Sequence, residues 1–155
     1  MERITLREAS DSDKALVFDL HERLFTSQIA EIWGWDTAQQ IEIFEREWTA
    51  SHVRVVECDR IFAGFIQQRD HEDHAYLLNF ALDKTFQSRG IGSQLIELLK
   101  DESKQLSKAL RLNVFRTNPR AQEFYRRHGF VVEQHGENGC TMMWMPSTEK
   151  KNGFD

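Results

Sequence analysis

Cysteines and long apolar segments are both scarce in this sequence, and their scarcity argues against two classes of protein. The 155 residues contain only two cysteines, Cys58 and Cys140, which are too few for a disulfide scaffold. No stretch reaches the roughly 18 apolar residues that a membrane-spanning helix needs, so no membrane partner is expected. The first residues, Met1 to Ile4, lack the apolar segment of a secretory signal. We therefore expect a reduced, cytoplasmic protein.

Positive charge is also outnumbered. Lys and Arg total 20 against 25 Asp and Glu, which gives a formal net charge of -5 and disfavours nucleic acid as a partner. The hydrophobic fraction of 40%, with 11 Phe and 4 Trp, is sufficient for a core. Since this length is typical of one domain, we expect a single domain over residues 1–146 and a polar tail over 147–155.

Apolar periodicity predicts an alternation of helices and strands along the whole chain. The expected order is one strand, two helices, three strands, a helix, a strand, a helix and two strands. We place the strands at residues 4–7, 52–57, 61–68, 76–82, 110–115, 131–134 and 141–145. The four helices are expected to start near residues 10, 36, 90 and 118. A loop over residues 29–36 is expected to join the first two helices.

The most informative segment is Gln87–Gly92, Gln-Ser-Arg-Gly-Ile-Gly, between the fourth predicted strand and the next helix. Its two glycines let the backbone approach a ligand, and the first turn of a helix offers unpaired N–H groups. The segment therefore predicts a pyrophosphate site. A dinucleotide fingerprint would need a third glycine where Leu95 stands, and a nucleoside-triphosphate loop would need Gly-Lys-Ser/Thr. An ordinary strand-to-helix turn remains an alternative.

A second segment, Asn118–Phe130, has the signals of a short helix. Asn118 is a suitable N-cap, Pro119 suits the first helical position, and Gly129 is a suitable C-cap. Tyr125 can point its phenol into a cleft and move a proton there, or it can be a core aromatic. By their spacing, four residues share one helix face: Ala121, Phe124, Tyr125 and His128.

Together these two segments, about 30 residues apart, resemble the GCN5-related N-acetyltransferase (GNAT) superfamily. Residues 87–92 match its Gln/Arg-x-x-Gly-x-Gly/Ala signature, and residues 118–130 match Asn-x-x-Ala-x-x-Phe-Tyr-x-x-x-Gly-Phe. The resemblance implies an α/β (α+β) acyl-CoA N-acyltransferase fold. Its central sheet is mixed, mostly antiparallel and flanked by helices. Strands four and five splay apart to form the cofactor cleft.

The resemblance also implies an activity: transfer of an acetyl group from acetyl-CoA to a primary amine of a small molecule or peptide. The amine attacks directly within a ternary complex, no metal takes part, and a homodimer is possible. An acyl-CoA-binding regulatory module without turnover is the alternative. Tyr125 favours the enzyme over that module. A different anion-binding α/β protein is disfavoured by the second motif.

By the same resemblance, Tyr125 protonates the leaving thiolate and Asn118 contacts the pantetheine region. Backbone groups of strand four pair with pantetheine like an added strand. The full set of residues that the resemblance implies in cofactor binding is Phe80, Ala81, Leu82, Gln87, Ser88, Arg89, Gly90, Ile91, Gly92, Ser93, Asn118 and Arg120.

The chain departs from several members of the family, which carry a carboxylate base early in strand four. Here Tyr76 and Asn79 occupy that stretch, and no Glu or Asp occurs from Ala75 to Leu82. Glu31 is the candidate base, because the loop after the first helix lines the acceptor site in the family. A solvated surface carboxylate is the alternative interpretation of this residue.

The acceptor is expected to contact Trp33, Trp35 and Asn79. The two indoles can wall an acceptor pocket, where an amine could lie against an aromatic face. They can equally pack the helical segment onto the sheet. His71 and His74 flank two acidic residues in a pattern that can bind metal, but a charged hairpin turn explains them more simply.

Overall fold

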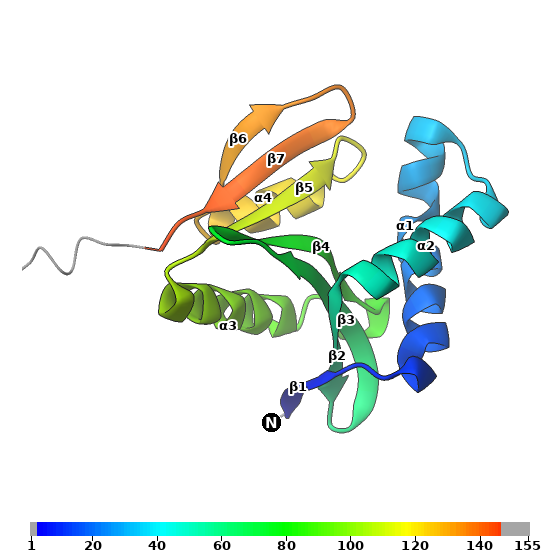
Figure 1. The fold of residues 1–155 in the computed structure, drawn as a ribbon, viewed down its shortest axis with the longest axis horizontal. Coiled ribbons are helices and arrows are strands. Elements are labelled where there is room, and N and C mark those ends of the chain that lie inside the picture. The colour runs from blue at the N-terminus through cyan, green and yellow to red at the C-terminus, as the bar shows by residue number, and fades with distance from the viewer. Residues whose placement is uncertain (1–2, 147–155) are drawn as a thin grey trace, which may run out of the picture. The chain divides into compact units, whose positions relative to one another are not determined.

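The computed structural model describes residues 3–146, and Figure 1 shows its ribbon. The helices are α1 (Lys14–Trp33), α2 (Thr37–Ala50), α3 (Ile91–Leu106) and α4 (Pro119–Arg127), with short 3-10 helices η1 (Asp11–Asp13) and η2 (Lys84–Phe86). The strands are β1 (Ile4–Glu8), β2 (His52–Cys58), β3 (Ile61–Asp70), β4 (His74–Leu82), β5 (Ala109–Phe115), β6 (Val131–His135) and β7 (Gly139–Trp144).

The seven strands hydrogen-bond in the order β1-β2-β3-β4-β5-β7-β6. The β1–β2, β2–β3, β5–β7 and β6–β7 pairs are antiparallel, whereas β4 and β5 run parallel. The predicted fold class, a mixed and mostly antiparallel sheet flanked by helices, is confirmed. The predicted polar tail over 147–155 lies outside the described residues.

Described residues 3–70 and 77–92 form one compact unit, whose core joins its helices to its strands. Phe18 of α1 meets Phe44 of α2 edge to face, with ring centroids 4.9 Å apart. Phe44 is 7% exposed, and burying a phenylalanine side chain fully contributes roughly 1.5–3 kcal/mol. The buried members of the cluster are Val17, Leu20, Phe44, Val53, Phe65 and Ala81, which come from α1, α2, β2, β3 and β4.

An ion-pair network holds the start of α1. The Arg7 guanidinium donates to both carboxylate oxygens of Asp13, at 2.9 and 2.8 Å, and to Glu57 at 3.0 Å. Asp13 also accepts from the backbone N–H of Ser10 at 2.8 Å. These bonds hold the pKa of the Asp13 carboxyl well below its usual range. Ser10 is the N-cap of η1, which leads into α1, in agreement with a helix predicted to start near residue 10.

The predicted loop over residues 29–36 is wrong for its first part, because α1 continues to Trp33. Glu31 and Trp33 thus lie in the last turn of a helix. The residues up to Trp33 are compatible with a helix, and the Gly34 N–H closes it by donating to the Ala30 carbonyl at 2.9 Å. Asp36 then caps α2 by accepting from the Gln39 N–H, in agreement with a helix predicted to start near residue 36.

Described residues 71–76 and 93–146 form the second compact unit. In it α4 packs beside β5 (Figure 1). The β5–β7 register pairs Leu112 with Met142, and both side chains are buried. The spacing of Ile91, Leu95, Leu98 and Leu99 predicts one apolar face of α3, and one of these residues needs a correction, since Leu98 is 40% exposed. Ile96 is buried in its place, together with Leu95. At about 100° per residue, Leu98 lies at the edge of the buried stripe rather than within it.

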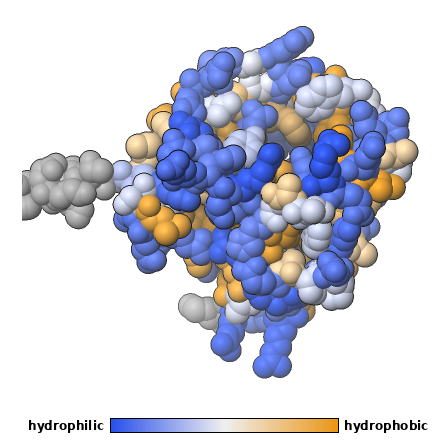
Figure 2. Space-filling model, viewed as in Figure 1, coloured by the Kyte–Doolittle hydropathy of each residue, from blue (hydrophilic) through white to orange (hydrophobic). Residues whose placement is uncertain are grey.

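Hydrophilic residues cover most of the face displayed in Figure 2, with apolar residues scattered among them. Scattered apolar side chains are ordinary on a protein surface. None of the helices within residues 3–146 is both long enough and apolar enough to cross a bilayer.

Candidate functional site

The predicted pyrophosphate turn follows β4 and contains two residues with left-handed backbone. Ser88 has φ 62° and Gly90 has φ 81°. A non-glycine residue in this region costs of order 1–3 kcal/mol, and such strain concentrates at ligand-binding loops. Ile91, the first residue of α3, is only 1% exposed and anchors the end of the turn.

The start of the turn is fastened by a side chain. Gln87 Nε2 donates to the carbonyl oxygen of Leu82 at 2.8 Å, which ties the turn to the last residue of β4. Asp83 adds to this anchor by donating its N–H to the Ala63 carbonyl at 2.8 Å. The Arg89 guanidinium lies 5.3 Å from the centre of the Phe86 ring, and Arg89 is exposed. The turn thus combines a fixed backbone with a cation.

The end of β4 is joined to a buried polar chain that the sequence did not reveal. The side chain of Asn79 donates to Gln67 Oε1 at 2.8 Å, and Gln67 Nε2 donates to Ser51 Oγ at 2.9 Å. Gln67 is 1% exposed, so its amide must be satisfied within the protein. Asn79, a predicted acceptor contact, therefore has its amide nitrogen committed to the β3 strand. Phe80 and Leu82 are partly buried at the end of β4, and Ala81 is buried.

The predicted base Glu31 and the predicted acceptor contact Trp33 lie in the last turn of α1, and the second predicted indole, Trp35, follows the C-cap Gly34. Trp33 is 57% exposed, Trp35 is partly buried, and Glu31 is exposed. The same helix carries a titratable group that the sequence did not single out. Burial lowers the pKa of His21 to about 4, and the centres of the His21 and Phe25 rings lie 5.1 Å apart.

In the second unit, the predicted N-cap of α4 is confirmed, whereas the C-cap is His128, one residue before the predicted Gly129. Asn118 Oδ1 accepts from the Ala121 N–H at 3.2 Å, and Pro119 occupies the first turn. The Asn118 N–H donates to the Phe115 carbonyl at 3.0 Å, which joins the helix to β5. Arg120 is exposed in the first turn. Asn118 is thus held rigidly by its own capping bonds.

Tyr125, the proposed acid, is 9% exposed. Its ring lies at an angle to Phe124 and Phe130, with centroid distances of 5.3 and 5.4 Å. Burial raises the pKa of the Tyr125 phenol, because a charged phenolate is disfavoured in an apolar setting. The phenol is therefore protonated throughout the neutral range and can donate a hydrogen bond.

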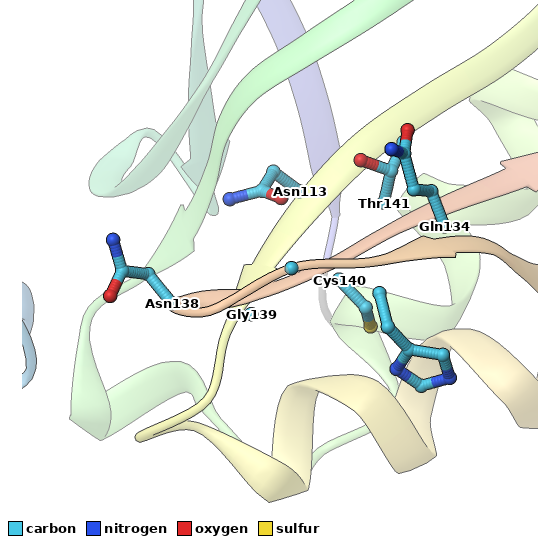
Figure 3. A pocket seen from close by; sticks show the side chains of 8 residues that line it. Asn113, Gln134, Asn138, Gly139, Cys140 and Thr141 are labelled. Atoms are coloured by element: carbon cyan, nitrogen blue, oxygen red, sulfur yellow. The ribbon is translucent and has the colours of Figure 1, made fainter.

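A polar pocket of about 230 Å³ lies on the last hairpin (Figure 3). Asn113, Thr141 and Gln134 stand on one side of the strands, whereas the Cys140 side chain points to the other. The register explains this, since Thr141 pairs with both Asn113 and Gln134. Uncharged hydrogen-bonding groups thus dominate the pocket. Its complete lining is Asn113, Gln134, His135, Gly136, Asn138, Gly139, Cys140 and Thr141.

The comparisons with known proteins decide the family. The model of the Acetyltransferase (GNAT) family matches residues 15–130, which is most of the chain. This chain belongs to the GNAT acetyltransferase family. The predicted family is thus confirmed, and membership implies acyltransferase chemistry. None of the curated proteins matches this sequence.

Solved structures resemble this GNAT chain over nearly its whole length. The PaiA N-acetyltransferase from Thermoplasma acidophilum, in complex with coenzyme A, has 19% identity and a TM-score of 0.75, over 92% of this chain and 99% of that one. Ard1 from Thermoplasma volcanium has 25% identity and a TM-score of 0.68, over 93% and 98%. A GNAT family acetyltransferase from Elizabethkingia anophelis with acetyl-CoA bound has 14% identity and a TM-score of 0.70, over 92% and 97%.

Both GNAT motifs fall within the matched range, but they belong to different compact units. Residues 80–92 of the predicted cofactor set lie in the first unit. Four other predicted residues lie in the second, namely Ser93, Asn118, Arg120 and Tyr125.

The His71–His74 segment of this GNAT chain is organised as a turn. The two imidazole rings stack with centroids 4.5 Å apart, and the His71 N–H donates to the His74 carbonyl at 2.8 Å. His74 Nδ1 lies 2.8 Å from an Asp73 carboxylate oxygen. Across residues 3–146, no three His, Cys, Asp or Glu side chains are grouped so that they could hold a metal ion.

Proposed function

We propose that this chain transfers an acetyl group from acetyl-CoA to a primary amine of a small molecule or peptide. The observation that carries this proposal is the family match over residues 15–130, which contains both motif segments. Structures similar to this chain include one in complex with coenzyme A and one with acetyl-CoA bound. The anchored turn, which is strained at Ser88, supports a ligand-binding role for the first motif.

We assign cofactor binding mainly to backbone groups, with a smaller contribution from side chains. N–H groups of the turn and of the first turn of α3 would donate to the diphosphate, favoured by the positive end of the helix dipole. Backbone groups of Phe80, Ala81 and Leu82 would pair with the pantetheine amides. Arg89 and Arg120 would add positive charge near the phosphates. No metal is required for any of these contacts.

The reaction itself is a direct displacement. The amine nitrogen attacks the thioester carbon, the new C–N bond forms, and the C–S bond breaks as the tetrahedral intermediate collapses. Tyr125 would give its phenolic proton to the departing thiolate and recover it from solvent. The proton lost by the amine would pass to Glu31 or to water. The exposed position of Glu31 on α1 supports water equally well as the base.

The acceptor site is assigned to Trp33, Trp35 and Asn79. Trp33 presents an exposed indole, against which a cationic amine could lie. The net charge of -5 mildly favours a cationic acceptor over an anionic one.

An acyl-CoA-binding module without turnover is the second candidate. It is favoured by the absence of a carboxylate in β4, between Ala75 and Leu82. The two candidates share the cofactor site and differ only in chemistry.

Thiol release from acetyl-CoA, measured across a panel of polyamines, aminoglycosides, amino acids and short peptides, tests the enzyme proposal. We expect release that depends on the amine. Absence of release across the panel, together with a thermal shift on adding coenzyme A but not ATP or NAD, would favour the binding module. Absence of any shift with coenzyme A would contradict both.

A further inference from the structure

Ser93, His128 and Glu97 form a three-residue polar relay between the start of α3 and the residue after α4. Ser93 and Glu97, together with Lys100, share one face of α3, because they are spaced by four and three residues. Ser93 Oγ lies 3.0 Å from His128 Nε2, and Glu97 Oε2 lies 3.1 Å from His128 Nδ1. The imidazole of His128 therefore bridges the serine hydroxyl and the carboxylate. All of these residues belong to the second compact unit.

Further contacts hold the imidazole in place. Lys100 Nζ donates to the His128 carbonyl at 2.9 Å and to Glu97 Oε2 at 3.2 Å, and it lies 5.2 Å from the centre of the Trp144 ring. The His128 ring also packs on Phe124, with centroids 4.7 Å apart. Gly129 follows with φ 92°, where a side chain would be strained and would meet Trp144 at 3.3 Å. His128 is thus fixed from both sides.

A serine hydroxyl, an imidazole and a carboxylate also form the catalytic triad of serine hydrolases, but two observations argue against that role for Ser93, His128 and Glu97. Glu97 has a side-chain exposure of 55%, whereas the carboxylate of a hydrolytic triad is buried. Glu97 Oε2 is also shared with the Lys100 ammonium, which weakens its support of an imidazolium. The arrangement is better suited to orienting a hydroxyl than to activating a nucleophile.

The direction of the Ser93 hydrogen bond depends on the charge of His128. When the imidazole is neutral, Nδ1–H donates to Glu97, so Nε2 must accept the Ser93 hydroxyl hydrogen. When the imidazole is protonated, Nε2–H donates to Ser93 Oγ instead. The hydroxyl hydrogen of Ser93 is then available to another acceptor.

We propose that His128 is a positioning residue that determines whether Ser93 can donate to the diphosphate of coenzyme A. This inference rests on the proposed function, which assigns the diphosphate to the turn that Ser93 continues. Protonated His128 would release the Ser93 hydroxyl toward the phosphate oxygens and add a nearby positive charge. Binding of the diphosphate would in turn favour protonated His128, so cofactor affinity should rise as the pH falls.

Two elements place other charged groups around His128. Those of α3 are Glu97 and Lys100, and those of its own helix end are Arg126 and Arg127. The hydrogen bond from His128 and the contacts of Lys100 lower the pKa of Glu97, so this carboxylate stays charged at neutral pH. Between about pH 5 and 8, histidine is the side chain that changes charge.

The test is calorimetric titration with dephospho-coenzyme A from pH 5.5 to 8.5. This probe keeps the diphosphate but lacks the 3′-phosphate, whose own ionisation near about pH 6 would imitate the effect. We expect affinity to increase about tenfold from the high to the low end, the scale of one hydrogen bond to a charged group. His128→Gln and Ser93→Ala should both remove this pH dependence. His71→Gln removes an imidazole elsewhere in the same unit and should retain it.

The outcomes separate the two proposals. The relay would be overturned if either variant, His128→Gln or Ser93→Ala, bound with the same pH dependence as the unmodified protein. It would also be overturned if the unmodified protein bound equally well at every pH. Neither outcome would contradict the cofactor site. Absence of binding at every pH would overturn both. A second measurement needs no variant: the pKa of the His128 imidazole, followed by NMR, should rise when dephospho-coenzyme A is added. An unchanged value would count against the relay.

Discussion

Gln87 fastens the phosphate turn to the end of β4, because its side-chain amide donates to the Leu82 carbonyl oxygen at 2.8 Å. The family motif names a glutamine or arginine at this position, and both residues carry a donor. In this chain the side-chain amide of Gln87 holds the backbone of the turn in place, and the ligand would bind to that backbone. Gln87 therefore affects ligand binding indirectly, by fixing the conformation of the turn.

Replacing Gln87 with Ala should weaken coenzyme A binding by roughly 5–10-fold, the effect of losing about one hydrogen bond. The turn would lose its anchor to Leu82 and would have to be ordered by the ligand. Calorimetry with coenzyme A measures the change. Gln105→Ala, on the exposed end of α3, is the matched control. Equal affinities for the two variants would show that the anchor is unimportant.

At Gly90 the cost of substitution should depend on backbone preference rather than on size. Its φ is 81°, yet a Cβ at this position would meet no atom within 4 Å. Val should therefore destabilise the protein by about 1–3 kcal/mol, and Asn, which tolerates a positive φ, by clearly less. Urea denaturation of both variants checks this. If Asn and Val cost the same, the strain argument fails.

Tyr125→Phe should lower turnover at least tenfold while leaving acetyl-CoA affinity nearly unchanged. The phenyl ring would keep the contacts with Phe124 and Phe130, so the melting temperature should also change little. Steady-state kinetics with the amine found by the panel, together with calorimetry, separates kcat from binding. Phe124→Leu is the control for ring packing. Turnover equal to that of the unmodified protein would exclude the acid role.

His21 should make the protein sensitive to mild acid. Its folded pKa of about 4 is below the ordinary value of 6.5, so the unfolded chain binds the proton first as the pH falls. The free energy of unfolding should decrease between pH 6.5 and 4, by at most about 3 kcal/mol from this group. Groups with lowered carboxyl pKa values, such as Asp13 and Glu97, act at lower pH.

The His21→Phe variant isolates this effect. It should show a shallower loss of stability from pH 6.5 to 4 in denaturant titrations, while His71→Gln should follow the unmodified protein. A slope in His21→Phe as steep as in the unmodified protein would mean that other groups cause the acid sensitivity.

Several features of the fold and site could be predicted because they depend on neighbours in sequence. Asn118 and Pro119 begin α4 through local capping chemistry, as predicted. The helix ends with His128 as its C-cap, one residue before the predicted Gly129, whose φ is 92°. Strand and helix order followed from periodicity, which is likewise a local property. The family followed from two short motifs, and the match over residues 15–130 confirms it.

Other features involve partners distant in sequence, and no local pattern indicated them. Ser93 and His128 are 35 positions apart in the sequence and are joined by one hydrogen bond, and Asn79 donates to Gln67, 12 positions away. Glu31 was expected in a loop and lies in α1, because nothing before Gly34 stops that helix.

By itself, the sequence determined the order of the elements, the ends of α4 and the family, since caps, periodicity and glycine positions act over a few residues. Only the tertiary structure decided which polar groups satisfy one another. Gln67 is buried between Asn79 and Ser51 because an amide removed from water must find partners wherever the fold supplies them. For the same reason His128, which the sequence placed only on one face of a short helix, connects the serine and the carboxylate of α3.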